Sequence, residues 1–238
     1  MTDILDDRLV ALAKRFETKD FINDDPSQFM HRYSDPLQQE RAAFIAASLS
    51  YGSRKQFIPK IDFLLQKDTL LGDGCMLADN DECFYRLHTN RMVNRFLSVM
   101  DEIWAEYGSL GGMMRKNNVH TALDAVTLIT SYFAQRNASH LVPKNSKSSC
   151  KRVCMFLRWM VRDNSPVDLG LWSDFIDKDS LIIPLDTHVI QEARRLGLLT
   201  SATGSMNTAL KLSKRMKEFF PGDPTRGDYA LFGLGVAE

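Results

Sequence analysis

The most informative stretch of the sequence is LIIPLDTHVIQEARRLGLL, residues 181–199. Pro184 disfavours helix at the preceding Ile183, and Asp186 stands where a helix N-cap belongs. Apolar residues follow at helical spacing, namely Val189, Ala193 and Leu196. The stretch therefore predicts a helix that begins directly after Asp186. As a cap alone, Asp186 would contribute about 1 kcal/mol of stability and no chemistry.

The rest of the chain shows the same helical pattern. Its apolar residues recur at intervals of three and four, with almost no alternation of period two. Pro59 predicts a kink or restart within the second helix, and residues 68–90 read as loop with room for one short helix. We expect helices over residues 36–52, 53–65, 91–106, 119–136, 148–162, 186–196, 207–220 and 226–238. Such a succession of helices without a strand predicts an all-α protein.

Two of these segments also indicate which side is buried. Residues 36–52 have Asp35 or Ser34 as the cap, and their expected buried face is Leu37, Ala43 or Phe44, Ala47, and Leu49 or Ser50. Residues 148–162 place another set of apolar side chains on one face, namely Val153, Phe156, Leu157 and Met160. We expect both faces to lie in the core.

The composition limits the classes of function. With 238 residues, of which 44% are hydrophobic and 25% charged, the chain is typical of a globular protein. Thirty basic and thirty acidic residues leave no net charge, which excludes a uniformly basic nucleic-acid binder. No apolar run approaches the roughly 20 residues of a membrane span, and the N-terminus lacks the layout of a signal peptide. We therefore expect a soluble, cytoplasmic protein with no membrane partner.

The cysteines match no common metal motif. They are spaced as C-x7-C and C-x3-C, unlike a zinc ribbon or a four-thiolate iron–sulfur run. The four are Cys75, Cys83, Cys150 and Cys154. We expect reduced thiols, no iron–sulfur cluster and no metal.

Charge is distributed unevenly along the chain. Residues 1–40 contain nine acids and five bases, a net charge of −4. Residues 144–162 contain six bases and no acid, namely Lys144, Lys147, Lys151, Arg152, Arg158 and Arg162. The ordinary explanation is a solvated helix face. Because a helix N-terminus with added cations attracts anions, the cluster also favours a phosphate contact.

The motif P-L-D-T-H-V, followed by the helix that contains Arg194 and Arg195, resembles the helix-hairpin-helix DNA glycosylase superfamily. The resemblance implies a two-lobed, all-α helix-hairpin-helix glycosylase-like fold over residues 1–238. Its lobes would be residues 36–140, with the acidic residues 1–35 attached, and residues 141–238. Within the superfamily, the chain is most similar to the archaeal 8-oxoguanine glycosylase branch.

The resemblance also implies the roles of individual residues. Asp186 matches the catalytic carboxylate and Lys151 the nucleophilic lysine of the superfamily. Asp228 and Phe232 match positions that hold the extruded base. The residues that would contact DNA phosphates are His188, Lys144, Lys147 and Arg152.

The chain departs from the superfamily pattern in its hairpin. Most members have Leu-Pro-Gly-Val-Gly before the lysine, whereas residues 141–150 are LVPKNSKSSC and contain no glycine. The gap from Lys151 to Asp186 is 35 residues, longer than in most members. The archaeal 8-oxoguanine branch shares a long gap and an unusual hairpin, so both departures indicate the same relative. Whether a monovalent cation binds at the hairpin is left open.

The function expected from the resemblance is base-excision repair by a bifunctional DNA glycosylase and AP lyase. The substrate would be double-stranded DNA with an oxidised purine, 8-oxoguanine first of all, bound by a monomer. Asp186 would stabilise positive charge on the sugar, and Lys151 would form a Schiff base with C1′. Two alternatives stay open, a non-catalytic reader of damaged or structured nucleic acid and an RNA-directed or protein-interaction module. In those cases Lys151 is a surface lysine, Asp186 a cap and Phe232 a core residue.

Overall fold

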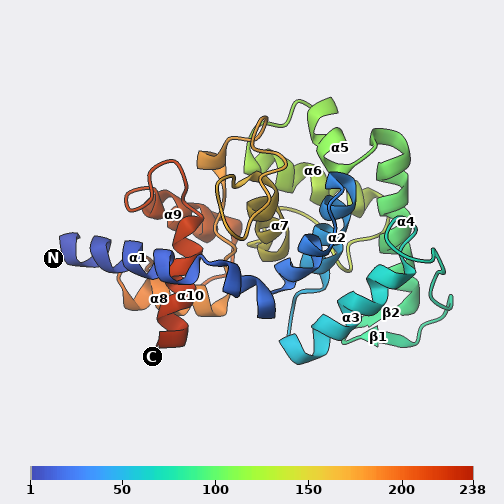
Figure 1. Cartoon of the computed structure of the whole chain (residues 1–238), viewed down its shortest axis with the longest axis horizontal. Helices are drawn as coiled ribbons and strands as arrows, with labels where there is room; N and C mark the ends of the chain where they lie inside the picture. Colours follow the sequence, from blue (N-terminus) through green and yellow to red (C-terminus); the bar gives the residue numbers. More distant parts are fainter. Residues whose placement is uncertain (1, 238) are drawn as a thin grey trace. The chain divides into compact units, whose positions relative to one another are not determined.

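The computed structural model describes the backbone of residues 2–237 and the side chains of residues 5–235. This part of the chain is mostly helical, which confirms the all-α prediction at the level of fold class (Figure 1). The α-helices are α1 Thr2–Phe16, α2 Pro36–Leu49, α3 Arg54–Lys67, α4 Asn90–Tyr107, α5 Leu110–Lys116, α6 Ala122–Gln135, α7 Lys151–Val161, α8 Thr187–Arg195, α9 Met206–Met216 and α10 Arg226–Ala237. Short 3₁₀ helices are η1 Lys19–Asp24, η2 Pro26–Arg32 and η3 Lys178–Ser180, and the strands are β1 Cys83–Tyr85 and β2 His88–Thr89.

The chain divides into two compact units. The terminal unit contains the residues up to Asn23, His120–Val126 and the residues from Ser146 onward. The central unit contains Asp24–Val119 and Thr127–Asn145. The N-terminal helix α1 therefore belongs to the same unit as residues 146–237, whereas the sequence grouped residues 1–35 with residues 36–140.

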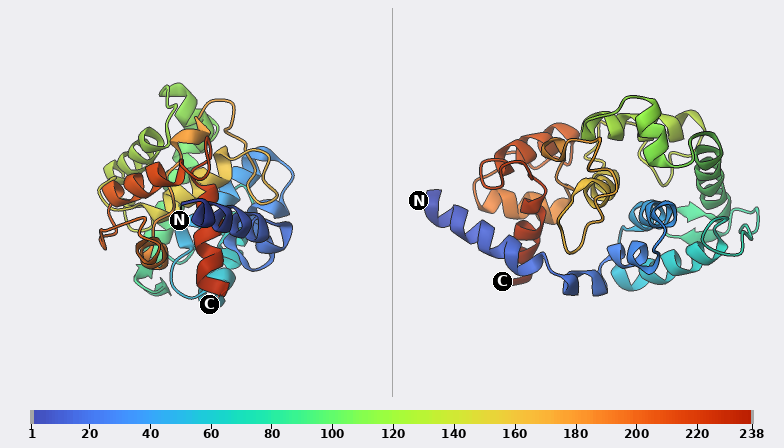
Figure 2. Two further views of the ribbon diagram at one scale, coloured as in Figure 1. Left: turned by 90° about the vertical axis from the view of Figure 1, so that its left-hand side faces the viewer. Right: turned by 45° about the horizontal axis from the view of Figure 1, so that its top comes forward.

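In the terminal unit, α1 packs against α10 (Figure 2). The rings of Phe16 and Phe232 meet edge to face with centroids 5.8 Å apart. Gly233 permits this approach, because a Cβ atom at this position would lie 2.4 Å from the Phe16 ring. Leu9 and Ala13 are fully buried on the same face of α1. Their spacing of four residues places them on one apolar stripe.

Helix α7 contributes the core of the terminal unit. The predicted apolar face is confirmed, since Val153, Phe156, Leu157 and Met160 are all buried. The helix begins at Lys151, three residues later than we predicted. The reason is local: Cys150 has a φ of 47°, in the left-handed region, and Ser148 pairs with Ser205 in an isolated bridge.

In the central unit, α2 begins as predicted. The Asp35 carboxylate accepts hydrogen bonds from the backbone N–H groups of Leu37 and Gln38. The residues from Ala42 to Ala47 are all buried. Leu37 was predicted to be buried but is 47% exposed, because it stands in the first turn, before the helix enters the core.

Helix α3 runs through Pro59 without the predicted restart. Proline removes the hydrogen bond to the carbonyl of Lys55, one turn earlier. Both residues are exposed, so the freed carbonyl lies on the side of the helix that faces solvent.

Residues 68–90 contain a β-hairpin that the sequence did not predict. Strands β1 and β2 pair antiparallel and are joined by the two-residue turn Arg86–Leu87. The Tyr85 hydroxyl donates a hydrogen bond of 2.6 Å to the carbonyl of Tyr51, which ties the hairpin to the end of α2. Strands of three and two residues are too short to produce a recognisable alternation. Helix α5 was also missed.

Two further expectations concern membranes and disulfides. Within residues 2–237, no helix combines the length and the apolar character that crossing a membrane requires. The cysteines are free thiols, exposed at Cys75 and Cys83 and buried at Cys150 and Cys154.

Candidate active site

Lys151 and Asp186 form an ion pair at the starts of two helices of the terminal unit. Lys151 is the first residue of α7, and Asp186 is the N-cap of α8. The Lys151 ammonium donates a hydrogen bond of 2.7 Å to Oδ2 of Asp186. The other carboxylate oxygen, Oδ1, accepts a hydrogen bond of 2.9 Å from the backbone N–H of Val189. The predicted cap is therefore confirmed, and the same carboxylate also holds the lysine.

A hydrogen bond from a side chain to the backbone, next to the pair, joins the two segments. The Ser149 hydroxyl donates a hydrogen bond of 3.0 Å to the carbonyl of Leu185. Ser149 lies two residues before Lys151, and Leu185 lies one residue before Asp186. This hydrogen bond therefore holds the two segments together in addition to the ion pair between Lys151 and Asp186.

Both reactive groups are half-buried, with 38% of the Lys151 side chain and 29% of the Asp186 side chain exposed. Burial raises the pKa of Asp186, but the charge and hydrogen bond of Lys151, the Val189 N–H and the charge of His188 together hold the pKa below its usual range. The carboxylate is therefore ionised at neutral pH. The site presents a primary amine and a fixed anion that a ligand can reach.

The four residues predicted to contact phosphates differ in their exposure and in the unit to which they belong. His188 is exposed in the first turn of α8, close enough to lower the pKa of Asp186. Lys147 is exposed, and its carbonyl accepts from the N–H of Met206 at 3.1 Å. Arg152 is half-buried on α7. Lys144 is exposed but belongs to the central unit.

The two predicted base-pocket residues contact other protein groups. The Asp228 carboxylate forms an ion pair with the guanidinium of Arg158. Phe232 meets Phe21 edge to face at 5.2 Å, in addition to Phe16. Phe232 therefore helps to anchor the N-terminal segment.

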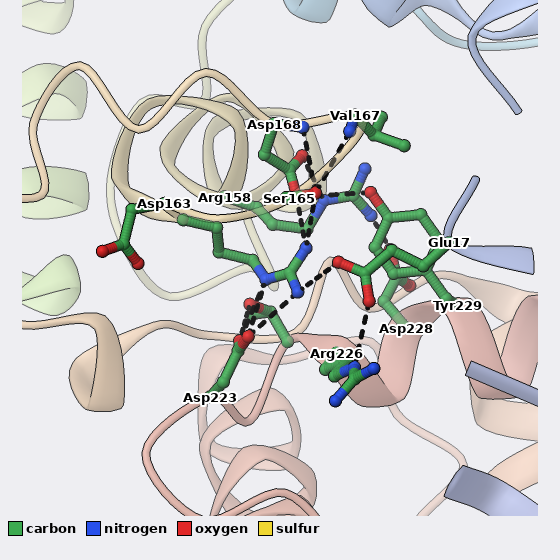
Figure 3. A network of polar contacts seen from close by, with 12 residues as sticks. Glu17, Arg158, Asp163, Ser165, Val167, Asp168, Asp223, Arg226, Asp228 and Tyr229 are labelled. Atoms are coloured by element: carbon green, nitrogen blue, oxygen red, sulfur yellow. Dashed lines mark hydrogen bonds and ion pairs between the residues drawn. The ribbon is translucent and has the colours of Figure 1, made fainter. Parts of the chain in front are cut away.

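Two of the six bases in residues 144–162, Arg158 and Arg162, belong to a buried ionic network (Figure 3). Arg162, the residue directly after α7, forms ion pairs with Asp168, with Asp223 and with Glu17, which follows α1. Burial opposes the charge of Arg162, but Asp168 and Asp223 more than offset this and raise its pKa, so it stays charged. The hydroxyl of Tyr229 donates to the same Asp168 carboxylate at 3.2 Å.

This network corrects one expectation. The six bases of residues 144–162 have no acid within the segment and favour a phosphate contact, yet Arg158 and Arg162 are buried against carboxylates. They are therefore not available for phosphates. The sequence did not reveal this because the partners Asp168, Asp223 and Glu17 lie outside the segment.

One exposed residue of the central unit was not predicted from the sequence as a candidate site residue. Leu87, at the tip of the β1–β2 hairpin, is 87% exposed, more than any other exposed large hydrophobic residue of the described chain. The preceding Arg86 has a φ of 54°, which turns the chain sharply at this point. Because the hairpin itself was missed, its tip was not recognised.

No metal site emerges from the side chains of residues 5–235, where no group of three or more His, Cys, Asp or Glu residues converges.

The fold and the site define a mostly helical protein with a lysine–aspartate pair at the starts of two helices. Residues 25–237 match the family described as "Protein of unknown function (DUF2400)", and the chain belongs to this family. No curated protein and no solved structure matches the chain.

Proposed function

We propose that the protein is a DNA glycosylase with AP lyase activity that removes an oxidised purine, 8-oxoguanine first of all, from double-stranded DNA. The observation that carries the proposal is the distance of 2.7 Å between the Lys151 amine and the Asp186 carboxylate, both accessible from solvent. Base excision by a lyase needs these two groups side by side, one as nucleophile and one as anion. The choice of 8-oxoguanine rests on the resemblance of the motif to the archaeal branch.

Each group has a defined part in the reaction. The bond between C1′ and the purine nitrogen breaks, and the purine leaves with the electron pair. The Asp186 carboxylate stabilises the positive charge that develops on the sugar. The Lys151 nitrogen forms the new bond to C1′. Opening of the sugar ring then gives a Schiff base, from which β-elimination breaks the C3′–O bond.

The proton balance follows from the ion pair. Attack requires a neutral amine, so one proton must leave Lys151 before the C–N bond forms. Oδ2 of Asp186 already accepts a hydrogen bond from this group and is positioned to take the proton. The departing purine, which needs one proton to become neutral, is its final acceptor. Asp186 thereby returns to the anionic form that stabilises the sugar cation.

The exposed hairpin tip supports binding to duplex DNA. A target base in the stack must be extruded before an enzyme can reach its glycosidic bond. Apolar side chains inserted between base steps unstack the duplex and favour this extrusion. Leu87 has the exposure that such a wedge needs.

Borohydride trapping tests the proposal. A duplex that carries 8-oxoguanine is incubated with the wild type, with Lys151→Gln and with the matched control Lys214→Gln, which changes an exposed lysine of α9, and sodium borohydride reduces any Schiff base. We expect a covalent adduct with the wild type and Lys214→Gln, and none with Lys151→Gln. The proposal fails if the wild type forms no adduct with either 8-oxoguanine or abasic duplexes.

A non-catalytic reader of damaged DNA is the second candidate. It is favoured by the engagement of Asp228 with Arg158, which occupies a carboxylate expected in the base pocket. This candidate predicts salt-sensitive duplex binding that Lys151→Ala leaves unchanged, together with no base release.

A further inference from the structure

The central unit contains a cavity of about 630 Å³ that the proposed reaction does not use. It is lined by one face of α3, by residues 76–78 and by strand β1 with its flanking residues. Figures 1 and 2 show α3 beside the β1–β2 hairpin. Ligand pockets in proteins typically measure about 300–1,000 Å³, so the cavity has room for a small molecule.

Two large apolar side chains of the cavity wall are exposed. Phe63 is 43% exposed and Met76 is 44% exposed, and both line the cavity. The ring of Phe63 lies 6.2 Å from the buried ring of Phe84, at an interplanar angle of 35°. An exposed aromatic ring supported by a buried one offers a flat, fixed surface. A second planar ring can stack on it.

Three charged side chains line the cavity, namely Lys60, Lys67 and Glu82. The Lys60 ammonium lies 4.9 Å from the centroid of the Phe84 ring, and Lys67 lies 6.0 Å from that of Phe63. Lys67 is neutralised by Asp73, to which it donates at 2.8 Å. Lys60 makes no ion pair with any residue of the described chain. A cation without a carboxylate partner beside an apolar wall suits a ligand that is planar at one end and anionic at the other.

We propose that this cavity binds a nucleotide, with the base stacked on Phe63 and the phosphate paired with Lys60. Aromatic side chains combined with a basic group are the usual means by which proteins hold unpaired nucleotides without reading their sequence. The nucleotide comes either from a free mononucleotide or from a single strand of nucleic acid. The inference goes beyond the proposed function, because it uses neither Lys151 nor Asp186.

Fluorescence titration of the full chain tests this site. The probes are 2-aminopurine riboside 5′-monophosphate and an eight-nucleotide single strand with one 2-aminopurine, since stacking quenches the fluorescence of this base. The variants are Phe63→Ala and Lys60→Gln, and the control is Lys55→Gln, which changes an exposed lysine of α3 outside the cavity. We expect Phe63→Ala to weaken binding about tenfold, Lys60→Gln to weaken it and reduce its salt dependence, and Lys55→Gln to have no effect.

The two probes identify the source of the nucleotide. Equal affinity for both supports a free nucleotide, and tighter binding of the oligonucleotide supports a single strand. The inference is overturned if the wild type binds neither probe, or if Phe63→Ala and Lys60→Gln bind like the wild type. Because Phe63 is partly exposed, its replacement should lower the Tm only modestly, and a thermal melt checks that the variant is folded. Absence of binding to both probes would leave borohydride trapping at Lys151 unaffected, so failure here is distinguishable from failure of the glycosylase proposal.

Discussion

The carboxylate of Asp186 serves two partners, since Oδ1 caps α8 through Val189 and Oδ2 holds the ammonium of Lys151 at 2.7 Å. The cap fixes the rotation of the carboxylate, so the second oxygen faces the amine from a rigid position. A substitution at this position therefore alters both the stability of α8 and the proposed chemistry. Different substitutions separate the two effects.

Asp186→Asn and Asp186→Ala should differ in stability but not in activity. Asparagine keeps an oxygen that accepts from the Val189 N–H, whereas alanine loses the cap at a cost of about 1 kcal/mol, or roughly 2–4 °C in Tm for a chain of this size. Neither stabilises a sugar cation, so both should slow base release at least about a hundredfold. Thermal unfolding and chromatographic detection of free 8-oxoguanine measure the two effects. If Asp186→Asn releases the base as fast as the wild type does, Asp186 acts only as a helix cap.

The stability that Asp186 contributes should depend on pH in the acid range. Its pKa is lower in the folded chain than in the unfolded chain, where it is about 3.9. A depressed pKa means that this stabilisation is fully present above about pH 4 and is lost as the pH falls through the lower, folded value. Urea unfolding should therefore show a gap between the wild type and Asp186→Asn that is constant from about pH 5 to 7 and shrinks below about pH 4. A gap that widens on acidification would contradict the assignment.

Arg162→Ala should strongly destabilise the terminal unit. It leaves the fully buried Asp168 with one charged partner fewer and removes the link between Asp223 and Glu17. Breaking a buried ion pair on one side costs about 3–5 kcal/mol. Arg215→Ala, which breaks the exposed pair with Glu218, is the matched control and should cost at most about 1 kcal/mol. Equal urea midpoints for the two variants would show that the network adds nothing.

Leu87→Ala should weaken binding to a lesion duplex without affecting the fold. At 87% exposure the side chain contributes little to the core, so the Tm should stay within about 1 °C of the wild type. A wedge that unstacks base pairs should contribute several-fold to affinity for duplex DNA. Fluorescence anisotropy measures this, with Leu70→Ala, an exposed leucine of the same unit, as control. If the two variants bind equally, Leu87 is no wedge.

The sequence predicted those features that depend on neighbouring residues. The helix after Asp186, its cap and the buried face of α7 all follow from spacing within a few turns. The same holds for α2 with its cap Asp35. The position of Lys151 opposite Asp186 came from resemblance alone, because a contact across 35 residues leaves no local pattern.

The features that the sequence missed depend on distant partners or on very short elements. No acid lies within residues 144–162, and the carboxylates that pair with Arg158 and Arg162 come from Asp168 and Asp223, outside the segment. The β1–β2 hairpin contains too few residues for a period to emerge, so Leu87 and the cavity at Phe84 were missed with it. Neither the distant partners nor the short strands leave a local pattern in the sequence.

Peptide mapping of the borohydride-reduced complex tests the central claim most directly. The wild type is trapped on a duplex with 8-oxoguanine, digested with a protease, and analysed by mass spectrometry for the residue that carries the reduced sugar. The account predicts that the sugar is attached to Nζ of Lys151. A sugar on another lysine, or no adduct on any substrate duplex, would contradict it.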